Sequence, residues 1–96
     1  MPRIARQSPR EFSRSWPDEA CEDTTAEVAR RFAQRLRSAL GGDSLRSAKA
    51  RTGIDHTVLS DILNGLTWPE LATIARLEHG LDADLWPGRI EKRTAQ

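Results

Sequence analysis

The sequence predicts a small all-α domain, a bundle of four to five helices, on the strength of three features. First, Val28, Phe32, Leu36 and Leu40 recur every four residues, which is the spacing of one helix face. Second, the segment 44–65 has the pattern of two short helices joined by a turn at a glycine. Third, no stretch alternates apolar and polar residues in the way that a half-buried strand does.

The first predicted helix spans about 24–40. Thr24 is followed three residues later by Glu27, which matches a capping box that satisfies backbone amides of the first turn. The pair Gly41 and Gly42 follows the last apolar residue of the stripe, and glycine is typical of a helix end.

Two shorter helices are predicted at about 45–52 and 56–63. Ser44 and Asp55 precede them and can offer side-chain oxygens to the first free amides. Gly53 lies between the two helices and permits the left-handed turn that ends the first one. The inward face of the second short helix consists of Leu59, Ile62 and Leu63.

The fourth predicted helix opens at Trp68-Pro69-Glu70, because proline is favourable at a first helical position, and runs to about His79-Gly80. Leu81, Leu85 and Trp86 are expected to close over the core. The predicted core comprises Phe32, Leu36, Leu40, Leu59, Ile62, Leu71, Ile74, Leu77 and Trp86.

Length and charge indicate one domain with a local basic surface. The 96 residues carry a net charge of only +1. Residues 28–53, however, hold seven Lys or Arg side chains against one acid, whereas residues 16–27 hold five acids. A polyanion would therefore meet a basic face of the molecule, unless these blocks are only solvated helix surfaces.

The composition predicts neither a metal site nor a catalytic site. Cys21 is the only cysteine, so an internal disulfide is excluded, and no pair of Cys or His has the spacing of metal ligands. We therefore expect no cofactor, no small-molecule substrate and no enzymatic activity. The chain also lacks an apolar run long enough for a signal peptide or a membrane span, which favours a cytoplasmic protein.

Three regions are expected along the chain. Residues 1–22 are predicted to form a flexible arm, basic at first and then acidic, and residues 89–96 a C-terminal tail, on either side of a domain at 23–88. Phe12 and Trp16 are unusual in so polar an arm. They are expected to dock either on the domain itself, which we favour, or on a partner.

Residues 44–88 carry a set of motifs that points to a known family. The motifs are Ser44-Leu45-Arg46, Thr52-Gly53, Leu59-Ser60, Ile62-Leu63, Gly65, Trp68-Pro69, Leu71, the run Thr73-Ile74-Ala75-Arg76-Leu77-Glu78, and Leu85-Trp86-Pro87. This half of the chain resembles the Cro/phage-repressor (XRE-like) helix-turn-helix DNA-binding family, in its actinobacterial and actinophage subgroup. The resemblance implies a lambda-repressor-like fold, in which the helix 56–63 enters the major groove of DNA.

Two residues depart from the family pattern. Lys49 stands where a small residue is usual, so its side chain must extend outward or widen the helix crossing, and its ammonium group could then reach a phosphate. Asp82 stands where glycine is usual, and aspartate tolerates the left-handed conformation less well.

The resemblance also implies which residues contact DNA. The side chains expected to meet base edges are those of His56, Thr57, Val58, Ser60 and Asp61. The residues expected to contact the DNA backbone are Ser44, Leu45, Arg46, Lys49, Asn64, Thr67 and Trp68. Arg3, Arg6 and Arg10 could follow an adjacent minor groove, although a solvated tail accounts for them equally well.

The expected function is a sequence-specific regulator of transcription that binds double-stranded DNA at the nucleoid. A repressor is favoured, either a phage immunity repressor or a host regulator. The alternative is an antitoxin or another protein-interaction module whose N-terminal arm, 1–22, binds a partner protein. The sequence leaves open whether the chain forms a homodimer.

Overall fold

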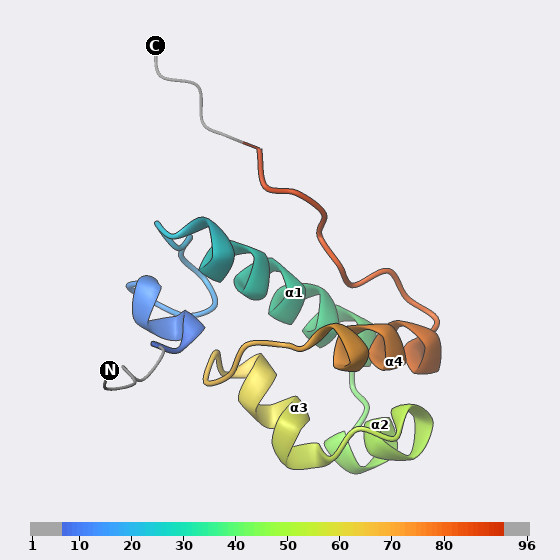
Figure 1. Cartoon of the computed structure of the whole chain (residues 1–96). Coiled ribbons are helices and arrows are strands. Elements are labelled where there is room, and N and C mark those ends of the chain that lie inside the picture. Colours follow the sequence, from blue (N-terminus) through green and yellow to red (C-terminus); the bar gives the residue numbers. More distant parts are fainter. Residues whose placement is uncertain (1–6, 92–96) are drawn as a thin grey trace, which may run out of the picture.

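The computed structural model describes residues 7–91 and consists of a short 3-10 helix and four α-helices (Figure 1). The 3-10 helix η1 spans Pro9–Phe12, and the α-helices are α1 Thr24–Leu40, α2 Leu45–Thr52, α3 His56–Leu63 and α4 Leu71–Leu81. No strand occurs in residues 7–91, and the predicted all-α fold is confirmed.

The core is formed by apolar side chains from all four α-helices and from the segment after α4. Phe32, Leu36, Leu59, Leu77 and Leu85 are each at most 1% exposed. α3 packs against α1, and α2 packs against both α3 and α4. This packing fixes α2 and α3 on one side of the bundle, away from the irregular segment 84–91 (Figure 1).

Two residues of the predicted core are exposed. Leu71 is 82% exposed because it is the first residue of α4, and the buried face of that helix runs through Leu77 and Leu81. Trp86 is 50% exposed, while its neighbour Leu85 is buried. Successive side chains of an extended segment point to opposite sides, so only one of these two neighbours can enter the core.

α1 begins differently from the prediction. Its N-cap is Asp23, whose carboxylate accepts a hydrogen bond of 2.9 Å from the amide of Ala26. Glu27 does not complete a capping box with Thr24. Instead its carboxylate is buried, accepts the amide of Cys21 at 2.9 Å and pairs with Arg30 at 2.6 Å. The backbone partner of Glu27 is therefore Cys21, which lies before the helix, and not the predicted Thr24.

α4 also begins and ends later than predicted. Glu70 is its N-cap, in an extended conformation, so Pro69 precedes the helix instead of occupying its first position. At the other end Asp82 adopts the left-handed conformation, with φ of 52°, that glycine would adopt more easily. Gly80 lies inside the helix, where an added Cβ would come within 2.6 Å of the Arg51 carbonyl oxygen. The missing side chain lets α4 approach the end of α2.

The described part of the predicted arm, residues 7–22, packs against the domain. The indole N–H of Trp16 donates to the carbonyl of Leu63 at 2.9 Å, at the end of α3. The indole N–H of Trp68 donates to the carbonyl of Gln7 at 2.8 Å, and the rings of Phe12 and Trp68 lie 6.4 Å apart. The two aromatic side chains of the arm thus dock on the chain itself.

Candidate nucleic-acid interface

The turn between α2 and α3 has the geometry that the sequence predicts. Gly53 caps α2 in the left-handed conformation, with φ of 76°, and its amide donates to the carbonyl of Lys49 at 2.8 Å. Asp55 then starts α3, because its carboxylate accepts the amide of Thr57 at 3.1 Å. Two helices joined in this way are a helix-turn-helix unit.

The outer side of α3 carries four of the five predicted base-contacting residues. Leu59, Ile62 and Leu63 are buried, which orients the helix. The side chains of His56 and Thr57 are exposed, Val58 is 39% exposed and Asp61 is half-buried. This side of α3 therefore presents four groups that can contact base edges: the imidazole of His56, the hydroxyl of Thr57, the methyl groups of Val58 and the carboxylate of Asp61.

Ser60, the fifth residue, lies on the flank of α3. It is half-buried, and its hydroxyl accepts a hydrogen bond of 3.2 Å from the side-chain amide of Asn64. Both residues line a cleft of about 300 Å³, with polar and apolar side chains, between the end of α1, the start of α2 and the end of α3. The position suits a backbone contact better than a base contact.

Arg37 lines the same cleft and is a candidate that the sequence analysis missed. It lies in the last turn of α1 and is exposed, because the buried face of this turn is formed by Leu36 and Leu40. Only the packing of α1 on α3 shows that this exposed arginine stands beside Ser60 and Asn64.

The start of α2 provides the predicted backbone-contacting groups. The hydroxyl of Ser44 accepts the amide of Ser47 at 3.1 Å, so Ser44 is the N-cap, as predicted. Leu45 is half-buried and Arg46 is exposed. The side chains of Arg46, Lys49 and His56 line a cleft between α2 and α3, which brings two basic side chains and an imidazole together.

Lys49 extends into solvent, as its size requires, but its ammonium group has a partner inside the protein. It lies 3.2 Å from a carboxylate oxygen of Asp55, and both side chains are about half exposed. The pKa of Asp55 is lowered, first by the amide of Thr57 and then by Lys49. A phosphate at this position would therefore have to compete with Asp55 for the lysine.

The loop after α3 contains the remaining predicted contacts. Asn64 is exposed and Thr67 is half-buried. The indole N–H of Trp68 is already used within the protein, because it donates to the carbonyl of Gln7, and its ring lies against Phe12. This arrangement does not favour a phosphate contact by Trp68. Of the three predicted arm residues, Arg10 is exposed, whereas Arg3 and Arg6 lie outside the described residues.

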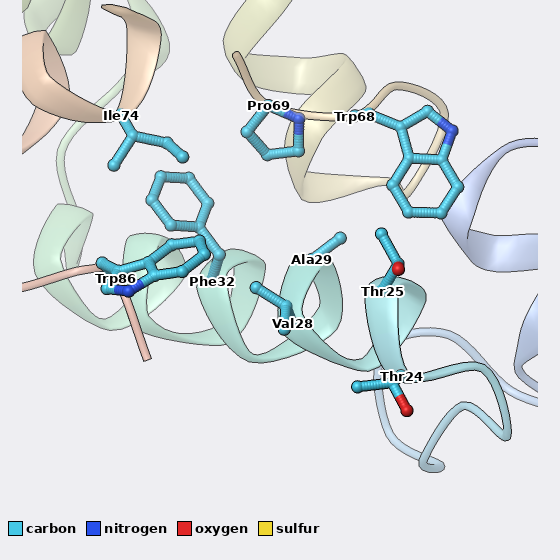
Figure 2. Close-up of a pocket in the computed structure, with 9 residues that line it drawn as sticks. All are labelled: Thr24, Thr25, Val28, Ala29, Phe32, Trp68, Pro69, Ile74 and Trp86. Atoms are coloured by element: carbon cyan, nitrogen blue, oxygen red, sulfur yellow. The ribbon is translucent and has the colours of Figure 1, made fainter. Parts of the chain in front are cut away.

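A second cleft, of about 400 Å³, lies between α1, the segment Trp68–Pro69, α4 and Trp86 (Figure 2). Its apolar lining includes Val28, Phe32, Ile74 and Trp86, and the ring of Phe32 lies between Ile74 and Trp86. Its lining contains two threonine hydroxyls but no acid, base or thiol. In residues 7–91, no three His, Cys, Asp or Glu side chains gather as metal ligands would.

Comparisons with known proteins support the fold. No family model and no curated protein matches the chain. Among solved structures, the chain is similar to the restriction-modification controller protein C.AhdI from Aeromonas hydrophila, with 27% identity and a TM-score of 0.51. The match covers 56% of this chain and 85% of that protein. The match supports the assignment of this chain to the helix-turn-helix type. It does not extend to the actinobacterial subgroup. No helix in residues 7–91 has the length and hydropathy that a membrane crossing needs.

Proposed function

We propose that this chain binds double-stranded DNA in a sequence-specific way and regulates transcription, as a repressor, without catalysing a reaction. The observation that carries the proposal is the orientation of α3. Its apolar side is buried by α1 and α2, and the opposite side exposes His56, Thr57 and Val58 with Asp61 beside them. An exposed helix of this kind, introduced by a tight turn after a preceding helix, fits the DNA major groove.

The surroundings of α3 support backbone contacts on both of its sides. Arg46 and the cap at Ser44 lie at the start of α2, and Arg37 and Asn64 line the cleft at the end of α3. Phosphate contacts of this kind fix the register of the helix, while base contacts set the sequence preference. The similar controller protein adds support for a regulatory role. Action at the nucleoid in the cytoplasm is part of the same proposal.

The alternative, a module whose arm binds a protein partner, receives less support. It was suggested by two aromatic side chains in a polar arm. Phe12 and Trp16 are instead engaged within the chain, by Trp68 and by the Leu63 carbonyl. Homodimerisation remains compatible with the proposal and is not needed for α3 to reach a groove.

Replacing Arg46 with alanine tests the proposal. We expect Arg46→Ala to weaken binding to all duplexes alike and to reduce the slope of log K against log salt by about 0.9, the value of one lost phosphate contact. Titrations over a range of salt concentrations measure the slope. Arg89→Ala, in the extended segment on the other side of the bundle, is the matched control and should leave it unchanged (Figure 1). Equal slopes for the two variants would refute the backbone contact at α2.

A further inference from the structure

The segment Ser8–Trp16, here called the N-terminal clip, is attached to the end of α3 and to the loop that follows. The amide of Arg10 donates to the carbonyl of Gly65 at 2.9 Å, and the indole of Trp16 donates to the carbonyl of Leu63 at 2.9 Å. In Figure 1 this part of the chain, in blue, lies beside the end of α3. Two separate hydrogen bonds therefore fix the clip at the loop where backbone contacts to DNA are proposed.

Gly65 shows how closely the clip approaches. Its φ of 69° lies in the left-handed region, and it is buried. A Cβ added there would come within 2.5 Å of the Trp16 ring and 2.9 Å of the Cβ of Arg10. The glycine thus serves the turn after α3 and at the same time makes room for the clip.

The clip changes the electrostatics at the end of α3. The last carbonyl groups of a helix carry a partial negative charge, which would repel a phosphate nearby. The clip donates two hydrogen bonds to carbonyl oxygens in this region and adds the exposed side chains of Arg10 and Arg14. Its own acid, Glu11, is directed back to Ser8, from which it accepts the amide at 2.7 Å and the hydroxyl at 2.9 Å.

We infer that the N-terminal clip is part of the DNA interface, with Arg10 and Arg14 as ligands of backbone phosphates beside the end of α3. This inference rests on the proposed function and extends the contact surface beyond the helix-turn-helix. It also gives Arg10 a fixed place next to Gly65, in contrast to a free arm that follows a minor groove.

The test compares two double variants that remove the same charge. One is Arg10→Gln with Arg14→Gln. The control is Arg35→Gln with Arg89→Gln, which lie on the other side of the bundle, where Arg35 donates to the carbonyl of Trp86 at 3.2 Å. Binding to a mixed-sequence duplex is measured over a range of salt concentrations. We expect the clip variant to lower the salt slope by about 1.8, for two phosphate contacts, and the control to keep the wild-type slope.

Equal slopes for the two double variants would overturn the inference, and so would a wild-type slope in the clip variant. Arg46→Ala separates these outcomes from a failure of the proposed function. If Arg46→Ala lowers the slope and the clip variant does not, only the clip is excluded from the interface. If the wild-type protein binds no duplex, the inference and the proposed function fail together.

Discussion

Replacing Glu27 with glutamine is expected to destabilise the fold by about 3 kcal/mol at neutral pH. The Glu27 side chain is 7% exposed, and its carboxylate accepts two hydrogen bonds from Arg30, at 2.8 and 2.6 Å, and one from Arg31 at 2.9 Å. It also accepts the amide of Cys21, and Arg30 in turn donates to the carbonyl of Pro17 at 3.0 Å. The substitution would leave the partly buried Arg30 guanidinium without its counter-charge.

The effect should depend on pH in a defined direction. Arg30, followed by the Cys21 amide and Arg31, lowers the pKa of Glu27 from its usual 4.5 to about 2. A carboxyl whose pKa is depressed in the folded state stabilises that state above pH 4.5, and this stabilisation is lost as the pH falls towards 2. The difference between wild type and Glu27→Gln should therefore shrink over this interval.

Urea denaturation at a series of pH values measures both effects. Glu22→Gln is the matched control, because Glu22 is an exposed acid just before the same helix, and it should change stability by less than about 0.5 kcal/mol. A constant difference between wild type and Glu27→Gln from pH 7 to pH 2 would show that the ion pair does not stabilise the fold.

Truncating Leu59 to alanine is expected to cost about 2–5 kcal/mol. Leu59 is fully buried, on the side of α3 that packs against α1 and α2, so the substitution removes apolar contacts and leaves a cavity. Val58→Ala, on the exposed side of the same helix, should stay within about 0.5 kcal/mol of wild type. Thermal or urea unfolding of the two variants gives the comparison. Similar midpoints for both would mean that α3 buries a different face.

The parts of the fold predicted correctly are those fixed by neighbouring residues. The bounds of α2 and α3 depend on the caps at Ser44 and Asp55 and on the left-handed turn at Gly53, and each of these acts within four residues. The apolar spacing along α1 likewise indicates its buried face. Such local signals can be identified in a sequence without knowledge of the rest of the structure.

The features that the sequence did not predict depend on contacts outside the regular helix patterns. Docking of Trp16 on the domain agrees with the sequence-based expectation, but its acceptor, the carbonyl of Leu63 47 residues away, had no local pattern. The spacing of Thr24 and Glu27 predicts a capping box, whereas Glu27 binds the buried amide of Cys21, six residues earlier in an irregular segment that has no recognisable pattern. Arg37 was missed for the same reason, since only tertiary packing places it beside α3.

The most direct test of the central claim, that α3 reads the DNA major groove, is selection of bound sequences from a pool of random duplexes. The wild-type protein should enrich a defined sequence. Thr57→Ala and Asp61→Ala should change the preferred bases at a few positions of that sequence, because these side chains lie on the outer side of α3. Arg46→Ala should enrich the same sequence with weaker binding. An unchanged sequence for both α3 variants, or no enrichment by the wild-type protein, would contradict the claim.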